Sequence, residues 1–134
     1  MTDLERLKAL SAKLRLSEWK IKTSKSIKAD VVAETELDVE DRRATFFRGD
    51  KWSEFAPEET YIHELMHLLV ADFRDAADRA VKRVASEDAR SVLEEELDLE
   101  EEKVCNLLAT ALYENRAFLD STGYRDPDGL RNTP

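Results

Sequence analysis

The amino-acid sequence predicts an α+β domain in which an N-terminal helix and a small sheet of about three strands precede two long helices. Leucines recur at helical spacing near the N-terminus, three short segments of the first half have the character of strands, and glycine and proline are scarce in most of the second half. A chain of 134 residues is long enough for one compact domain without disulfides. We therefore expect a single domain over residues 1–122 and a C-terminal tail over residues 123–134.

The first helix and the first strand follow from the spacing of apolar residues. Five leucines near the N-terminus recur at helical spacing, which predicts an amphipathic helix over about residues 3–16. In EWKIKTS (residues 18–24), Trp19 and Ile21 alternate with charged side chains, as apolar residues do in a half-buried strand. The leucine face of the helix is expected to pack on the core together with this strand.

Two more strands and two long helices complete the predicted fold. The strands are expected at DVVAETEL (residues 30–37) and at RATFFR (43–48). Pro57 then marks a helix start, because proline suits the first turn and the two glutamates after it favour the positive end of a helix. This helix should continue, with or without a break, to about residue 88, and the last helix should span about residues 92–120.

The charge of the chain argues against nucleic acid as a partner. The net charge is −9 at pH 7, and like charge raises the cost of approaching a phosphate backbone. Residues 1–28 carry a net charge of +5 and the rest of the chain −14, but no aromatic residues are interleaved with the early lysines as single-strand binding requires. We interpret the basic segment as a solvated face.

Cysteine content and hydropathy predict a cytoplasmic protein. Cys105 is the only cysteine, so it is expected to be a small buried residue in a reducing compartment and not part of an intramolecular disulfide. The N-terminus lacks a basic segment followed by an apolar one, and no apolar run approaches the roughly 20 residues of a bilayer span. We expect neither export nor a membrane partner.

The segment TYIHELMHLLV (residues 60–70) contains both histidines of the chain. His63 and His67 are four residues apart, so on a helix both rings can face one cation. Glu64 is rotated by about 100° from His63, where it can accept a proton from metal-bound water instead of ligating the metal. Two histidines and an acid buried together without a cation would leave costly unpaired groups. The pattern predicts a zinc site with Glu64 as the catalytic base.

A catalytic zinc site needs a third protein ligand. No third histidine exists, so carboxylates and Cys105 remain as candidates. The predicted last helix contains LDLEEEKVCNLLATAL (residues 97–112), which offers Glu101 and Glu102. Glu101 lies nearer the centre of the apolar arc of that helix. The residues alone leave both glutamates open.

Together, HELMH and this downstream segment resemble the gluzincins, the thermolysin-like group in which HExxH is completed by a glutamate on a later helix. The chain more closely resembles the small prophage-associated peptidases of the ImmA/IrrE type, whose downstream helix reads roughly E-x-x-A-N-x-F-A-x-x-L-L. Against that pattern the chain has Glu102, Cys105, Asn106, Leu108, Ala109 and Leu112. The registration implies Glu102 as the third zinc ligand, with Glu101 as the alternative, and Asn106 as a group that hydrogen-bonds a zinc-bound histidine.

The resemblance also implies a compact zincin-like fold and a function. In that fold an edge strand borders the cleft and pairs with an extended substrate, and RATFFR is the candidate edge strand, with ordinary hairpin pairing as the alternative. The implied activity is that of a zinc-dependent metallopeptidase acting on a protein or peptide. The alternative is a catalytically inactive zincin-like module that binds metal and acts in protein–protein regulation. The oligomeric state is left open.

Overall fold

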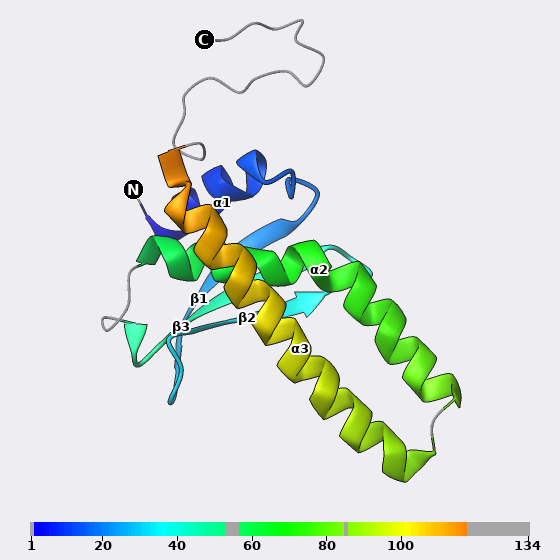
Figure 1. Cartoon of the computed structure of the whole chain (residues 1–134). Coiled ribbons are helices and arrows are strands. Elements are labelled where there is room, and N and C mark those ends of the chain that lie inside the picture. The colour runs from blue at the N-terminus through cyan, green and yellow to red at the C-terminus, as the bar shows by residue number, and fades with distance from the viewer. Residues whose placement is uncertain (1, 53–56, 85, 118–134) are drawn as a thin grey trace, which may run out of the picture.

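The computed structural model describes residues 2–52, 57–84 and 86–117 (Figure 1). An N-terminal helix is followed by three strands and two long helices, which confirms the predicted α+β class. The elements are α1 (Asp3–Lys13), β1 (Lys20–Lys28), β2 (Ala33–Asp38), β3 (Arg43–Gly49), α2 (Pro57–Val84) and α3 (Glu87–Glu114).

Side-chain caps explain where the helices begin. The Thr2 hydroxyl accepts a hydrogen bond from the backbone N–H of Glu5, and the Glu5 carboxylate accepts one from the Thr2 N–H, so α1 begins with a capping box. The last helix begins earlier than predicted, because the Ser86 hydroxyl accepts the Ala89 N–H and caps it. Helix α2 begins at Pro57 as predicted.

The helix ends differ from the prediction by a few residues. Helix α1 ends at Lys13 and not near residue 16, and α2 runs without a break to Val84. Helix α3 ends at Glu114, before the predicted end near residue 120. The expected tail over residues 123–134 lies outside the described residues.

The sheet has the strand order β1-β3-β2, with β3 in the centre. β3 pairs with β1 in parallel and with β2 in antiparallel orientation. The expectation that RATFFR forms the edge strand beside the cleft is therefore wrong, because both sides of its backbone are already paired within the sheet. β2 is the edge strand on that side. The spacing of apolar residues identifies a strand but not its neighbours in the sheet. Here β2 forms the edge, and β3, which follows it in the sequence, lies between β1 and β2.

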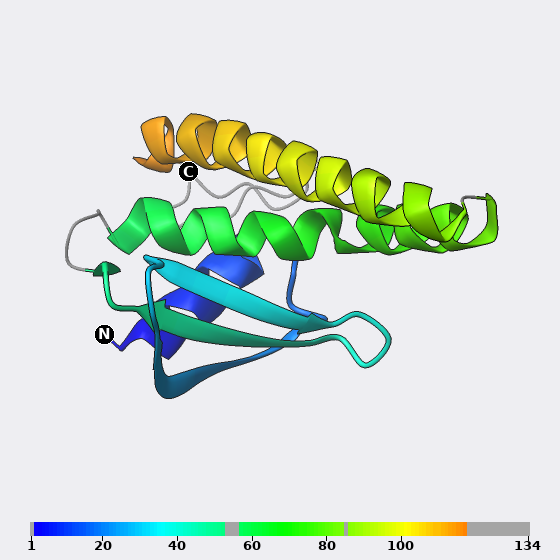
Figure 2. The same ribbon diagram turned by 90° about the horizontal axis from the view of Figure 1, so that it is seen from below.

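The elements form layers, as Figure 2 shows: the sheet lies on one side of α2 and α3 on the other. Within the described residues, no helix combines the length and the apolar character of a membrane span. Helices α1 and α2 bury their apolar faces against the sheet, where the core includes Leu7, Leu10, Ile21, Ala44, Phe46, Ile62, Leu65 and Leu68. This packing fixes the rotation of α2 about its axis and hence the direction in which its other face points.

Gly49 allows the chain before β2 to pass close to the end of β3. A Cβ atom at this position would lie 1.8 Å from the carbonyl oxygen of Val31, so only glycine fits. The Gly49 N–H donates to the carbonyl of Val32 at 2.7 Å. This contact holds residues 31–33 in the position where they border the site described next.

Candidate metal centre

The two histidines lie on one face of α2, in the part of the helix that packs on the sheet. The Nε2 atoms of His63 and His67 are 3.3 Å apart, and the rings meet edge to face. The neighbouring residues Ile62, Leu65 and Met66 are fully buried. Because these apolar neighbours anchor the helix, both imidazole rings are held where they can face a single ion.

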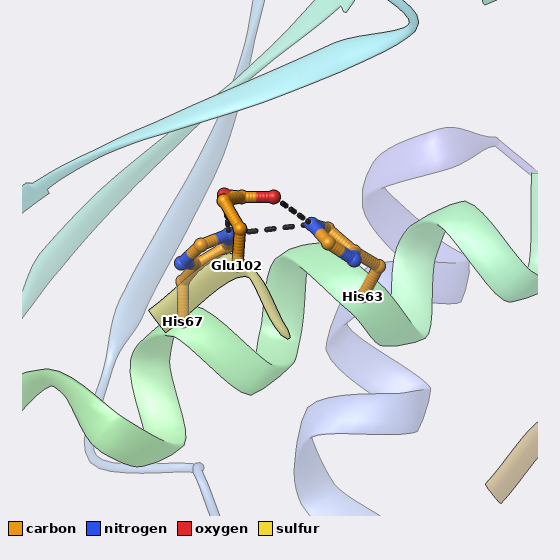
Figure 3. A group of neighbouring side chains, drawn as sticks. All are labelled: His63, His67 and Glu102. Atoms are coloured by element: carbon orange, nitrogen blue, oxygen red, sulfur yellow. Dashed lines mark hydrogen bonds and ion pairs between the residues drawn. The ribbon is translucent and has the colours of Figure 1, made fainter. Parts of the chain in front are cut away.

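Glu102 reaches the histidines from α3 and completes a group of three side chains that could hold a metal ion (Figure 3). One of its carboxylate oxygens lies 3.3 Å from Nε2 of His63, and the other lies 3.0 Å from Nε2 of His67. Three side chains therefore meet at one point: His63 and His67 of α2 and Glu102 of α3. Glu102 follows His67 by 35 positions in the sequence.

These separations match the edges of a tetrahedral zinc site. Zinc binds histidine nitrogen and carboxylate oxygen at about 2.0–2.2 Å, so two ligand atoms of a tetrahedral ion lie about 3.3–3.5 Å apart. The observed distances between donor atoms are 3.0 to 3.3 Å. The side chain of Glu102 is 55% exposed, so it has room for the small adjustment that the ion would require. The donor set fits zinc in both chemistry and spacing.

Glu101 contacts the other nitrogen of the His67 ring. Its carboxylate oxygen lies 2.5 Å from Nδ1, whereas Glu102 lies at Nε2. Adjacent residues differ by about 100° around a helix, and α3 uses this difference to place one carboxylate on each side of the same ring. A carboxylate at the outer nitrogen of a ligand histidine fixes the ring orientation and its tautomer. Glu101 is thus placed to orient His67, while Glu102 lies at Nε2 on the side of His63.

Arg74 of α2 holds Glu101 in place. Its guanidinium lies 3.2 Å from Glu101, 2.8 Å from Asp98 and 3.0 Å from Asp78. The hydrogen bond with His67 and, less strongly, the charge of Arg74 hold the pKa of Glu101 below its ordinary value. Glu101 is therefore an ionised acceptor for the His67 Nδ1–H.

Cys105 is buried, as expected, and its Sγ lies 3.6 Å from Nδ1 of His67. Burial alone would lower the pKa of His67, but the contacts with Cys105 and Glu101 outweigh burial and raise the pKa to about 11. His67, Glu101 and Cys105 also form a group with metal-ligand chemistry. In this second group the charge of Glu101 is already compensated by Arg74.

Glu64 lies on the sheet side of α2, next to Thr35, and also lines the cleft that His63 borders. It is 6% exposed, and burial raises its pKa, an effect that the charges of His67 and His63 partly offset. The neighbouring Thr35 hydroxyl favours the ionised form, although among the described residues that hydroxyl has no well-aligned hydrogen-bond partner. A carboxyl group with a raised pKa can both accept and return a proton near neutral pH.

A cleft of about 530 Å³ opens beside the centre. Asn106 lies in its wall and is exposed, and no hydrogen bond joins it to either histidine in the part of the chain that the structure describes. The contact that the resemblance implied for Asn106 is instead made by Glu101. The cleft is lined by residues 31–33 before and at the start of β2, by Glu59, Thr60, His63 and Glu64 of α2, and by Asn106, Ala109 and Thr110 of α3.

Arg74 and Thr35 belong to the site but were not among the residues predicted for it. Arg74 follows His67 by seven residues, which places both on one face of α2, so a helical projection would have indicated Arg74 as a partner for an acid near His67. No sequence pattern indicates Thr35, because its position next to Glu64 depends on where β2 lies in the sheet.

Comparisons of the chain with protein-family models, with curated proteins and with solved structures returned no match.

Proposed function

We propose that the protein is a zinc-dependent metallopeptidase of the gluzincin type, with His63, His67 and Glu102 as ligands and Glu64 as the general base. The observation that carries this proposal is the spacing of the three donor groups, 3.0 to 3.3 Å, beside a cleft that His63 and Glu64 line. Three protein ligands leave a fourth tetrahedral position for water, as catalytic zinc sites require.

Each side chain then has a defined task in peptide hydrolysis. When bound, zinc lowers the pKa of a water molecule toward about 7 and polarises the scissile carbonyl. Glu64 accepts the proton of the attacking water and later delivers it to the leaving amine, and its raised pKa suits both steps. Glu101 and Arg74 hold the His67 ring with Nε2 toward the ligand position.

The cleft and the edge strand support a peptide as the substrate. Among the described strands, β2 pairs only with β3, and the residues leading into it form one wall of the cleft. An extended peptide could pair with such an edge by backbone hydrogen bonds. A protein or peptide in the cytosol is the substrate class that we propose.

The first test is metal content after dialysis, measured by elemental mass spectrometry. We expect about one zinc ion per chain in the wild type and a marked loss in Glu102→Ala. Glu100→Ala is the matched control, because Glu100 lies on the same helix but pairs with Lys103 at the surface. A wild type that retains no zinc while remaining folded would refute the metal centre.

The second test separates the peptidase from the inactive module. Glu64→Gln should retain zinc and lose hydrolysis of a denatured protein substrate, because the amide cannot accept the proton of water. Zinc binding without hydrolysis by the wild type, over a broad set of peptides, would favour the regulatory module instead.

A further inference from the structure

The cleft beside the metal centre contains a carboxylate that catalysis does not use. Glu59 lies in the first turn of α2, four residues before His63, so both face the same side of the helix. The Thr110 hydroxyl donates to Glu59 at 3.4 Å. Within the described residues, Glu59 has no cationic partner, whereas its neighbour Glu58 forms two 2.6 Å hydrogen bonds with Arg6.

The remaining walls of the cleft combine apolar residues with Glu64 and the polar residues Thr60, His63, Asn106 and Thr110. Val31, Val32, Ala33 and Ala109 provide the apolar surface, and none of the described lining residues is a lysine or an arginine. Glu64, which is more than nine-tenths buried, borders the same space and has no ion-pair partner among the described residues. An apolar wall that leads to an unpaired carboxylate matches a side chain with an apolar stem and a cationic end.

We propose that this cleft is a subsite for a lysine or arginine side chain of the substrate, with Glu59 as its counter-charge. The inference rests on the proposed peptidase function and names the substrate class: peptides with a basic residue near the scissile bond. The methylene groups pack on the valine and alanine side chains, and the cationic end reaches the Glu59 carboxylate. An apolar side chain of the same length would leave Glu59 desolvated and unpaired, and an acidic one would be repelled.

The charge of the chain favours the same substrates. The net charge of −9 attracts cationic peptides at long range, and an anionic cleft strengthens this attraction locally. The volume of about 530 Å³ falls in the range of small-molecule sites, so an extended side chain enters without requiring the helices to separate.

The experiment compares quenched fluorescent peptides that differ at one position only. An alanine-based peptide carries lysine, methionine or glutamate at each position in turn, and kcat/KM is measured with the zinc-loaded wild type and with Glu59→Gln. Methionine matches the unbranched stem of lysine without its charge. We expect lysine to be preferred over methionine by about tenfold or more at one position in the wild type, and the preference to fall to about twofold in Glu59→Gln.

Glu58→Gln is the matched control for charge in the first turn of α2. Its carboxylate binds Arg6 and is not part of the described cleft wall, so the lysine preference should persist in this variant. Glu59→Lys should reverse the preference toward glutamate. Hydrolysis with no position-specific preference for lysine, or with a preference that survives in Glu59→Gln, would overturn the subsite while leaving the peptidase intact.

A binding measurement separates the subsite from the peptidase. Fluorescence anisotropy of the labelled lysine and methionine peptides is measured with wild type and Glu59→Gln without any need for turnover. Tighter binding of the lysine peptide that depends on Glu59, in a protein without hydrolytic activity, would support the subsite and refute the peptidase. Equal binding of both peptides, together with absent hydrolysis, would refute both.

Discussion

Helices α2 and α3 form a hairpin, and different contacts stabilise the half near the candidate metal centre and the half far from it. The half near the metal centre packs on the sheet, and its residues Ile62, Leu65 and Met66 are at most 2% exposed. The far half extends beyond the sheet, as Figure 2 shows, and exposes large apolar side chains such as Phe73, at 79%. The near half is thus fixed by a shared core, while the far half is held mainly by contacts between the two helices.

Arg74 connects the two halves. It lies on α2 just beyond the packed segment and contacts Asp78 and Asp98 of the far half as well as Glu101 at the centre. The far half therefore contributes to the orientation of His67 even though none of its residues is a ligand. The proposed ligands therefore depend on the near half, which the core holds rigid. The hydrogen bond at the outer nitrogen of His67 depends in part on residues of the far half, which is less buried.

The largest effect is expected within the near half, at Glu64. Glu64→Gln should lower kcat by about 10²–10⁴-fold, because general base catalysis contributes that much. Zinc content should be unchanged, since Glu64 is not one of the three ligands. The measurement is kcat on a peptide that the wild type cleaves, with elemental analysis of the same samples. Retained turnover would exclude Glu64 as the base.

The next effect compares one apolar residue from each half. Leu65→Ala should lower the free energy of unfolding by about 2–5 kcal/mol, because it leaves a cavity in the packed core. Phe73→Ala should change it by no more than about 0.5 kcal/mol, because that side chain is largely exposed. Urea denaturation of both variants, with chelator present, measures the difference. Equal destabilisation would show that the far half is as firmly packed as the near half.

Much of this fold could be predicted from the sequence, because local patterns determine it. The leucine spacing predicts α1, and the acidic turn after Pro57 predicts the start of α2. The order of the strands could not be predicted, because alternation in RATFFR indicates a half-buried strand and says nothing about its neighbours. The edge strand beside the cleft was therefore assigned to the wrong segment.

The metal centre could be predicted in part. The spacing of His63 and His67 indicates two ligands on one helix, but the partner from α3 depends on how the helices cross. The helical projection placed Glu101 nearer the apolar arc, and its side chain is indeed the more buried, at 18% against 55% for Glu102. Burial does not decide which carboxylate lies next to both histidines, because both glutamates contact His67 but at different nitrogens.

A third prediction tests the link between the halves. Arg74→Met should weaken zinc binding by about 10-fold, because loss of the group that holds Glu101 frees the His67 ring. Arg79→Met is the matched control: Arg79 lies one turn further on α2 and pairs only with Asp75, at 3.4 Å on the surface, among the described residues. Competition with a fluorescent zinc chelator measures both affinities. Equal affinity in the two variants would show that the far half does not influence the site.

The last effect concerns pH and the contacts of His67 with Cys105 and Glu101. In the folded protein, contacts with Cys105 and Glu101 raise the pKa of His67 from about 6.5 to about 11, so these contacts stabilise fully below pH 6.5 and their contribution is lost as the pH rises toward 11. With chelator present, the wild type should therefore be less stable to urea at pH 9 than at pH 6. In His67→Gln this part of the pH dependence should disappear, and Glu101→Gln should reduce it. With zinc bound, the change of stability with pH should have the opposite sign. Protons compete with zinc for Nε2, so zinc binding strengthens as the pH rises. The change in metal-free stability between pH 6 and pH 9 is compared in the wild type and in His67→Gln. An equal rise in both proteins would show that Glu101 does not hold a proton on this ring.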